Sequence, residues 1–362
     1  MAETKSSLRE LALIFLRLGF SSFGGPAVHI ANMNDEFVKR RRWLSSEEFL
    51  DLLGATNMIP GPNSTEMAIH IGYSRGGVPG LIVAGVCFIV PAALIVLAIA
   101  VGYVQFGTLP QLERMLYAIK PVVIAIIAFA VADLGRTATK TRFLIVLGVA
   151  AATANVLGLH ELAVLFGAGF VSFMWKRGIG IGSTVLRAVV PLEMFLYFLK
   201  IGSVLFGSGY VLVAFLQADL VEKAGVLTQR QLIDAIAVGQ ITPGPLFTTA
   251  TFIGYVLAGT GGAILGTIGI FLPAFIFVAI THTFVRGLRK NPAAQAILDG
   301  INVAAVAIMA VVIWRLAHAA FVDGFSFIIG IAAAAVLWRF RGASAWVVLG
   351  AAMIGLISDL FA

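Results

Sequence analysis

The fold of this chain is decided by the stretch Met58-Ile59-Pro60-Gly61-Pro62-Asn63-Ser64-Thr65-Glu66 and by a second Pro-Gly-Pro at Pro243-Gly244-Pro245. Each tripeptide interrupts an otherwise apolar region. Because proline lacks a backbone N–H and clashes with the preceding turn, two prolines around a glycine must end a helix. The sequence therefore predicts two helical elements that are broken in the same way.

The sequence around these breaks is repeated. Phe15–Gly24 aligns with Phe198–Gly207 at an offset of 183 residues, and the same offset superposes the two Pro-Gly-Pro tripeptides. After a one-residue deletion, Pro91-Ala92 aligns with Pro273-Ala274. We therefore predict two homologous units, residues 1–185 and 186–362, which is the usual construction of secondary transporters.

The composition indicates a membrane protein. Of the 362 residues, 60% are hydrophobic and 12% are charged, whereas roughly a quarter of the residues of a soluble domain are charged. Residues 1–10 carry charges and no cleavage site follows them, so we expect no removable signal peptide. The bilayer is the expected solvent of an all-α protein. The main apolar runs are Val78–Val104, Pro121–Ala132, Phe195–Leu216, Ile264–Thr281 and Val303–Ile313.

The charge and cysteine content exclude several classes of function. The net charge is +7, but the cations form short clusters between apolar runs, so a topological role is a better explanation than nucleic-acid binding. The single cysteine, Cys87, excludes an internal disulfide and a cysteine-based metal site. We expect it to be a small core residue.

Two membrane topologies fit the repeat. If the Pro-Gly-Pro segments cross the membrane, the units are parallel and the connecting Lys and Arg divide almost evenly between the two sides. If they form re-entrant hairpins, each unit has about five transmembrane helices plus a hairpin, the second unit is inverted, and most of the cations share one side. Because positive loops stay in the cytoplasm, we favour the inverted repeat, with both termini outside the cytoplasm. The cations on the poorer side are Lys5, Arg9, Arg114, Lys223, Arg230 and Arg315.

The residues after each break predict an anion site. In the first unit, Asn63 or Ser64 can cap a new helix, with Glu66 reaching back as in a capping box. A helix that begins inside a membrane leaves free N–H groups and a partial positive charge. Two such helix starts in an inverted repeat would face each other near the midplane and bind an anion. The candidate binding residues at these starts are Gly61, Asn63, Ser64, Thr65, Gly244 and Thr248.

One cation lies inside the first helix of each unit, and we expect these two helices at residues 11–23 and 192–206. The two cations are Arg17 and its repeat mate Lys200. Such a charge is costly unless it faces a partner or a watery cavity, and two equivalent cations favour an anionic substrate. Snorkelling to the interface and ion pairing remain open as alternatives. The candidate carboxylates for pairing are Asp51, Glu66 and Asp234.

Polar and glycine-rich positions extend the candidate site. The first helices end at Gly24-Gly25-Pro26 and Gly207-Ser208-Gly209, where irregular backbone would line a cavity or allow close helix packing. Asn57 and Gln240 precede the two breaks and offer amide donors to an oxyanion, or satisfy the broken backbone.

Proton coupling is a weaker hypothesis. Glu66 and His70 are spaced i, i+4 on one helix face and could relay protons, or satisfy each other. No nucleophile, phosphate-binding or metal-spaced motif is visible, so we expect neither an enzyme, nor a cofactor, nor a metal. The carboxylates that could join such a relay are Asp51, Asp133 and Asp299.

These motifs carry a family resemblance. Phe23-Gly24-Gly25-Pro26, Trp43, Pro60-Gly61-Pro62 and Ile71-Gly72-Tyr73 resemble the long, two-domain form of the chromate transporter family. The resemblance implies a bacterial cytoplasmic-membrane protein that exports chromate, a tetrahedral dianion, by using the membrane potential or an ion gradient. The second unit departs from the pattern at Ser208, Gly209 and Val226. The positions that the resemblance implicates are Gly24, Gly25, Pro26, Pro60, Gly61, Pro62, Gly207, Pro243, Gly244 and Pro245.

The leading hypothesis is a secondary transporter that binds an oxyanion between the two hairpins near the midplane. A carrier of sulfate or another oxyanion, an anion channel and a membrane enzyme are the alternatives. The expected partners are a chromate-like or sulfate-like dianion and membrane lipid, with no nucleic acid, and a homodimer is left open.

Overall fold

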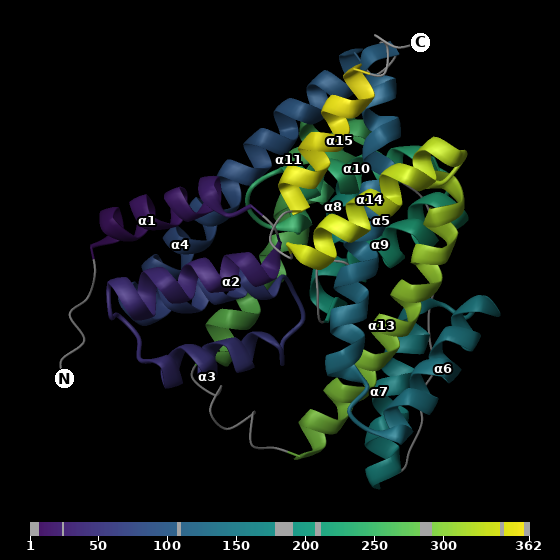
Figure 1. The fold of residues 1–362 in the computed structure, drawn as a ribbon. Coiled ribbons are helices and arrows are strands. Elements are labelled where there is room, and N and C mark those ends of the chain that lie inside the picture. The colour runs from purple at the N-terminus through teal and green to yellow at the C-terminus, as the bar shows by residue number, and fades with distance from the viewer. Residues whose placement is uncertain are drawn as a thin grey trace. The chain divides into compact units, whose positions relative to one another are not determined.

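In the computed structural model, residues 7–23, 25–106, 110–177, 191–206, 211–282, 292–340 and 344–357 are described, and every regular element in them is a helix (Figure 1). The predicted boundary between the repeat units, at residues 185 and 186, lies outside these ranges. The helices of the first half are α1 (Leu8–Ser21), α2 (Pro26–Asn34), η1 (Asp35–Arg40), α3 (Ser46–Thr56), α4 (Asn63–Phe106), α5 (Pro110–Ala138), α6 (Arg142–Val156) and α7 (Glu161–Arg177). Those of the second half are α8 (Pro191–Val204), α9 (Val211–Leu216), η2 (Gln217–Lys223), α10 (Gln229–Ile241), η3 (Leu246–Thr248), α11 (Thr249–Thr281), α13 (Pro292–Ala320), α14 (Gly324–Arg339) and α15 (Ser344–Ile357).

Side-chain caps fix where several helices begin. The hydroxyl of Ser7 accepts the N–H of Glu10 at the start of α1, and Thr141 caps α6 in the same way. Ser45 and Glu48 form a complete capping box on α3. These bonds satisfy N–H groups that a helix start otherwise leaves unpaired.

Each long helix that follows a Pro-Gly-Pro contains a chain reversal. Within α4, Gly77 has φ +61° and ψ −149°, which is not helical. A Cβ built on Gly72 would lie 2.4 Å from the carbonyl oxygen of Gly80, although eight residues of straight helix span about 12 Å. α4 is therefore two helical limbs that fold back on each other. The equivalent residues of α11 are Gly254, Gly259 and Gly262.

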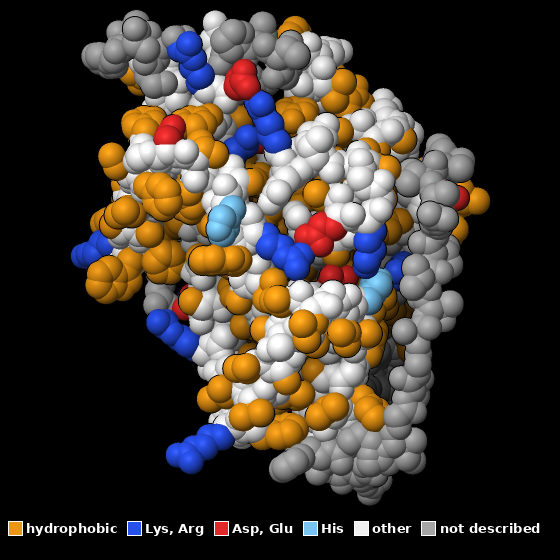
Figure 2. Space-filling view, turned by 90° about the vertical axis from the view of Figure 1, so that its right-hand side faces the viewer, with side chains coloured by type: hydrophobic (Ala, Val, Ile, Leu, Met, Phe, Trp, Pro, Cys, Tyr) orange, Lys and Arg blue, Asp and Glu red, His pale blue; other side chains and the backbone are white. Residues whose placement is uncertain are grey.

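Four helical stretches are long and apolar enough to cross a bilayer. They form two repeat-related pairs, α4 with α11 and α5 with α13, and many large apolar side chains are exposed on them. On the face in Figure 2, hydrophobic side chains are spread widely while charged ones form small groups. The chain is therefore an integral membrane protein. The four stretches are Asn63–Phe106, Glu113–Ala138, Leu246–Thr281 and Gln295–Ala320.

The helices form two compact units, each of which draws on both halves of the sequence. Unit 1 comprises residues 1–105, 190–209 and 238–290, and unit 2 comprises residues 106–189, 210–237 and 291–362. α8 packs on α11 in unit 1, whereas α13 packs on α5, α6 and α7 in unit 2. Both Pro-Gly-Pro breaks belong to unit 1.

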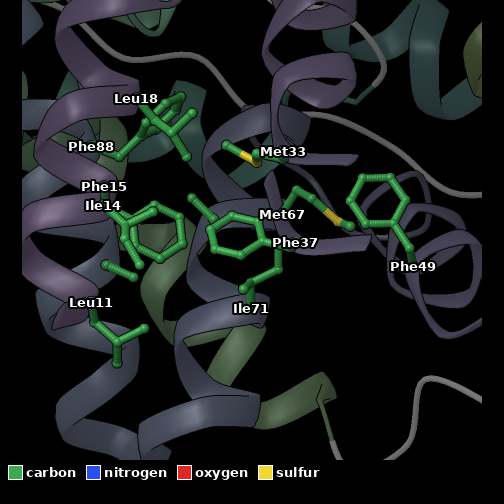
Figure 3. Close-up of a cluster of buried hydrophobic side chains, with 12 residues drawn as sticks. Leu11, Ile14, Phe15, Leu18, Met33, Phe37, Phe49, Met67, Ile71 and Phe88 are labelled. Atoms are coloured by element: carbon green, nitrogen blue, oxygen red, sulfur yellow. The ribbon is translucent and has the colours of Figure 1, made fainter. Parts of the chain in front are cut away.

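The core of unit 1 joins its first helix to the connection and to α4. Phe15 of α1 packs against Phe37 of η1, with a distance of 5.3 Å between their ring centroids. Figure 3 shows these rings beside Met67 and Phe88 of α4. Cys87 is half-buried at the edge of this cluster, close to its expected role as a small core residue.

Candidate functional site: the Pro-Gly-Pro loops of unit 1

The two Pro-Gly-Pro loops make reciprocal hydrogen bonds with the broken ends of helices from the opposite half. Gly61 N–H donates to the carbonyl oxygen of Leu205, which follows α8, at 2.8 Å. Gly244 N–H donates to the carbonyl oxygen of Ser22, which follows α1, at 2.9 Å. Ser22 and Leu205 are themselves repeat mates at the offset of 183 residues. Each loop is therefore hydrogen-bonded to the helix break of the other half of the sequence.

Both loops require glycine. Gly61 has φ +139° and Gly244 has φ +93°, values that residues with a side chain rarely adopt. A Cβ on Gly244 would lie 2.7 Å from the Cβ of Ala92, and one on Gly61 would lie 3.6 Å from the Cβ of Ala274. These two alanines are also repeat mates. The reciprocal arrangement thus extends from the hydrogen bonds to the packing.

His29 organises the first loop, and it was missed by the sequence analysis. One ring nitrogen lies 3.0 Å from the carbonyl oxygen of Ser22, and the other lies 3.1 Å from the hydroxyl of Ser64. Asn32 donates to the Ser22 hydroxyl at 3.2 Å. His29 is buried, so these bonds tie the end of α1 to the first turn of α4. No sequence motif marks it, because its partners are 7 and 35 residues away.

Several buried polar atoms near the loops have no hydrogen-bond partner among the described residues. They include the hydroxyl of Thr65, the side-chain nitrogen of Gln240 and the side-chain oxygen of Asn63. Thr65 is fully buried and Gln240 is 5% exposed. Because a buried polar group without a partner costs about 1–3 kcal/mol, such a group is a candidate for binding a ligand. Thr65 and Gln240 both offer N–H or O–H donors.

The predicted capping box at the start of α4 is wrong. Asn63 is the first helical residue, and Pro62 accepts the backbone N–H groups of Thr65 and Glu66 at 2.7 and 3.0 Å. The Glu66 carboxyl oxygens accept no hydrogen bond from any described residue. Pro62, which precedes the first helical residue, has no backbone N–H for a carboxyl group to accept, so no capping box can form there.

Asn57 satisfies local groups. Its amide donates to the carbonyl oxygen of Leu53 at 3.1 Å, and its oxygen accepts the amide of Asn63 at 2.6 Å. Asn57 is exposed at the end of α3. Both hydrogen bonds of Asn57 are local to the hairpin, and its contact with an oxyanion stays a prediction.

The second loop has the same backbone but a more apolar lining. Leu246 and Phe247 follow Pro245, in the places of Asn63 and Ser64, and both are buried. The hydroxyl of Thr248 donates to the carbonyl oxygen of Pro245 at 2.8 Å. Thr248 thus closes a short 3-10 turn before α11.

Arg17 forms an ion pair, but with a carboxylate outside the expected set. Its guanidinium lies 2.5 Å from Glu36 in η1, and Arg41 lies 2.7 Å from the same carboxylate. Glu36 has a side chain only 6% exposed. Burial alone would raise its pKa, but hydrogen bonds from Arg41 and Arg17 outweigh burial, so the pKa lies below its ordinary value. This pair was not predicted, because Glu36 lies in a charged connection 19 residues from Arg17.

Lys200 has a different environment from its repeat mate Arg17. It is exposed on α8, and no ion pair joins it to another described residue. The repeat mate of Glu36, Asp219, lies in η2 of unit 2 and is paired with Lys223 at 3.2 Å. The two embedded cations are therefore not equivalent in the folded chain.

Other predicted site residues divide into three groups. Gly25 precedes α2 with φ +82° and Pro26 is its first residue, so this helix break is present as expected. Asp133 makes an ion pair with Arg136, and Asp299 makes one with Lys140; all four residues belong to unit 2, whereas Glu66 belongs to unit 1. Gly24, Gly207 and Ser208 lie outside the described residues.

One cluster in unit 2 has metal-ligand chemistry. Ligand atoms of His160, Glu161 and Asp219 lie within 4.8 Å of one another. The amine of Lys223 lies 3.7 Å from Glu161 and 3.2 Å from Asp219. Since this ammonium group already supplies a cation, the cluster is an ion-pair network.

A row of titratable side chains is buried in unit 1. His70 follows Glu66 by one helical turn, and both are fully buried. The Nδ1 atoms of His70 and His282 lie 3.0 Å apart. His282 follows α11 and was not a predicted site residue, because 212 residues separate it from His70.

Comparison with known proteins identifies the family. A family model described as chromate transporter matches residues 9–173 and again residues 192–356. The chain is 32% identical to a chromate transport protein of Cupriavidus metallidurans, over 97% of this chain and 93% of that protein. It is 31% identical to a probable chromate transport protein of Synechococcus elongatus, over 92% and 90%.

Relatives also occur in archaea. An uncharacterized transporter of Methanocaldococcus jannaschii is 27% identical over 86% of this chain and 85% of that protein. No solved structure matches the chain. The two family matches begin 183 residues apart, at the offset of the internal repeat. The predicted resemblance is thus confirmed, and the chain belongs to the chromate transporter family, a family of transporters and not of enzymes.

Proposed function

We propose that this protein is a secondary transporter that exports chromate across the bacterial cytoplasmic membrane and binds it at the Pro-Gly-Pro loops. The observation that carries the proposal is a pair of buried donors, the Thr65 hydroxyl and the Gln240 amide, that have no hydrogen-bond partner in the described part of the chain. They flank the two loops at equivalent distances in sequence, three residues after Pro62 and three before Pro243. A desolvated oxyanion needs several such donors.

The helix starts add to this binding chemistry. The first limb of α4 begins at Asn63 and runs to Gly77, so its first turn carries the partial positive charge of a helix N-terminus. Anions bind at such termini because N–H groups point toward them. Chromate, a tetrahedral dianion, would accept bonds from these groups as well as from Thr65 and Gln240.

We also propose that residues 1–185 and 186–362 are inverted repeat units with re-entrant hairpins. Two features of the first hairpin support this topology. α3 has 11 residues and spans about 16 Å, short of the roughly 30 Å of a bilayer core. The chain then reverses at Gly77. The hairpin therefore has limbs too short to cross.

Cysteine accessibility tests the topology. Single cysteines are introduced at positions 5 and 287 after Cys87→Ser removes the native thiol. A membrane-impermeant reagent should label them from opposite sides. Labelling of both from the same side would contradict the inverted arrangement.

Transport in inverted vesicles tests the function. Vesicles with the wild-type protein should accumulate labelled chromate, and ionophores that collapse the membrane potential should abolish accumulation. Sulfate is added as a competitor, because it offers the same charge and shape. Preferential sulfate transport would favour the alternative oxyanion carrier, and flux insensitive to every gradient would favour a channel.

Matched variants then test the site. Thr65→Val and Gln240→Met should each reduce chromate uptake at least tenfold, because each removes a donor to the anion. Thr56→Val is the control, since Thr56 is also fully buried but its hydroxyl already donates to Leu53 at 2.9 Å. Equal chromate uptake by all three variants would contradict binding of the anion at these loops.

A further inference from the structure

Glu66 is a buried carboxyl group that the binding site above does not use. It lies in the first turn of α4, is 0% exposed, and neither oxygen has a hydrogen-bond partner among the described residues. A Cβ built on Gly61 would lie only 2.2 Å from one of these oxygens, so the carboxyl abuts the Pro-Gly-Pro loop. An ionised carboxylate in such a place is very costly unless a counter-charge accompanies it.

Two imidazoles extend from this carboxyl toward the end of α11. His70 lies four residues after Glu66, and side chains with this spacing are neighbours on one helix face. The Nδ1 of His70 lies 3.0 Å from the Nδ1 of His282, whereas its Nε2 is buried and has no partner among the described residues. His282 is half-buried, so the row leads from a fully buried group toward a more accessible one.

The surroundings of the row are mainly apolar. Ile59, Ile69, Ala274 and Val278 form a buried cluster on α4, α11 and the loop, with Tyr73 and Phe275 packed against it. Tyr73 is a titratable neighbour of the row, and its ring lies 4.3 Å from that of His282. Arg17, the cation on α1, is engaged by Glu36. A proton is therefore the simplest counter-charge for Glu66.

The position of Glu66 beside the loop gives its charge a consequence. A carboxylate next to Gly61 would repel a dianion bound at the loops, and in a site of low dielectric this repulsion is strong. A neutral carboxyl group would not repel it. Binding of a proton and binding of the anion would then favour each other, and such coupling is reciprocal.

We propose that Glu66, His70 and His282 form a proton pathway, and that one proton held on Glu66 accompanies each oxyanion bound at the Pro-Gly-Pro loops. The inference rests on the proposed oxyanion transport. The proton enters at His282, crosses the Nδ1–Nδ1 hydrogen bond to His70, and leaves the other nitrogen of that ring for the Glu66 carboxylate. No covalent bond other than those to the proton changes. A dianion that leaves with one proton still carries net negative charge outward, so the membrane potential drives its export.

Proton uptake on binding is the direct test. Purified protein in weakly buffered detergent solution at pH 8 is titrated with chromate while a pH-sensitive dye is followed, with a protein-free titration as reference. Repeated over a pH series, the uptake should approach one proton for each chromate bound where Glu66 is ionised in the free protein, and should vanish at lower pH where Glu66 is already protonated. The apparent affinity should fall about tenfold for each pH unit once Glu66 must be protonated on binding.

Variants separate the carboxyl group from the two imidazoles. Glu66→Gln mimics the neutral carboxyl, so it should bind chromate without proton uptake and without pH dependence. His70→Gln and His282→Gln should keep equilibrium binding but slow proton uptake at least tenfold in stopped-flow measurements. The controls are Glu47→Gln and His318→Gln, both exposed and outside the row.

The outcomes distinguish the two proposals. If the wild-type protein binds and transports chromate without taking up protons, or if Glu66→Gln keeps wild-type proton uptake, the proton pathway is wrong and the transport proposal stands. Proton uptake replaced by a requirement for Na⁺ would also overturn it. If the wild-type protein neither binds nor transports chromate, both proposals fail.

Discussion

The two Pro-Gly-Pro hairpins share a loop backbone conformation but differ in the side chains that surround the loop. Gly61 and Gly244 each have positive φ, and each donates its N–H to the helix break of the opposite half. Around the first loop lie His29 and Ser64, whereas the repeat mates of these residues are Leu212 and Phe247. The loop backbone and its hydrogen bonds are thus alike in the two repeats, whereas these polar and titratable side chains lie around the first hairpin.

This difference suggests a division of labour. Apart from the Gln240 amide, the second hairpin contains buried apolar side chains and threonines whose hydroxyls are satisfied locally, so its contribution beyond that amide is mainly structural. The first hairpin holds Thr65, Glu66 and His70, whose side chains have buried atoms with no hydrogen-bond partner among the residues that the structure describes. In the second sequence repeat, residues 186–362, Phe252 occupies the position of His70. We infer that substrate and proton chemistry belong chiefly to the first hairpin.

The largest effect is expected from alanine at the two loop glycines. Gly61→Ala and Gly244→Ala should each lower the free energy of unfolding by about 1–3 kcal/mol for the backbone conformation alone, and by more where the Cβ clashes. Thermal unfolding of the purified proteins measures this. Gly158→Ala is the control, since Gly158 has φ +89° but a Cβ there would meet nothing within 4 Å.

A rescue sharpens the same comparison. The clash at Gly244 is with the Cβ of Ala92, so Ala92→Gly should recover part of the stability lost in Gly244→Ala. No recovery, or wild-type stability of both loop variants, would contradict the reciprocal packing of the loops.

The next effect concerns the polar lining of the first loop. Ser64→Ala should lower the free energy of unfolding by about 1–3 kcal/mol, because it leaves a nitrogen of buried His29 unpaired. The matched change Thr248→Val removes only a local bond to Pro245, and should cost about 0.5–1 kcal/mol. Denaturant unfolding compares the two.

A double variant isolates the Ser64–His29 interaction. His29→Leu introduces the residue type found at Leu212 in the second unit, and should make Ser64→Ala nearly neutral when the two are combined. Additive losses in the double variant would show that the two side chains act independently.

A smaller effect separates the two helix cations. Arg17→Ala should reduce the free energy of unfolding by about 0.5–1 kcal/mol, because Glu36 keeps Arg40 and Arg41. Lys200→Ala should leave stability unchanged but lower chromate uptake, since no described carboxylate pairs with it. Unfolding and vesicle uptake are measured on the same preparations, and wild-type uptake by Lys200→Ala would exclude that lysine from the anion path.

The smallest effect is a pH dependence at Glu36. Because its pKa in the folded protein lies below its ordinary value of 4.5, its ionised form contributes stability that is present above about pH 4.5 and is lost as the pH falls. The stability difference between the wild type and Glu36→Gln should therefore shrink on acidification. A difference that grows toward low pH would reverse the sign of this interaction.

Local patterns in the sequence predicted the helix breaks and the repeat, because proline chemistry and a constant offset are visible without tertiary contacts. The helix ends after residues 21 and 204 and the breaks at Gly61 and Gly244 follow from those patterns. The contacts between residues distant in sequence could not be predicted from such patterns. Glu36, His29 and His282 meet their partners only through folding, so neither the ion pair of Arg17 nor the bond between His70 and His282 could be found from spacing.

The central claim is that chromate binds at the reciprocal Pro-Gly-Pro loops. Crystals of the protein grown with chromate, measured near the chromium absorption edge, locate the metal of the oxyanion directly. We expect one anomalous peak at the loops, placed so that the oxygens of the chromate lie within hydrogen-bonding distance of the Thr65 hydroxyl and the Gln240 amide. A peak at the Arg17–Glu36–Arg41 cluster, with none at the loops, would contradict it.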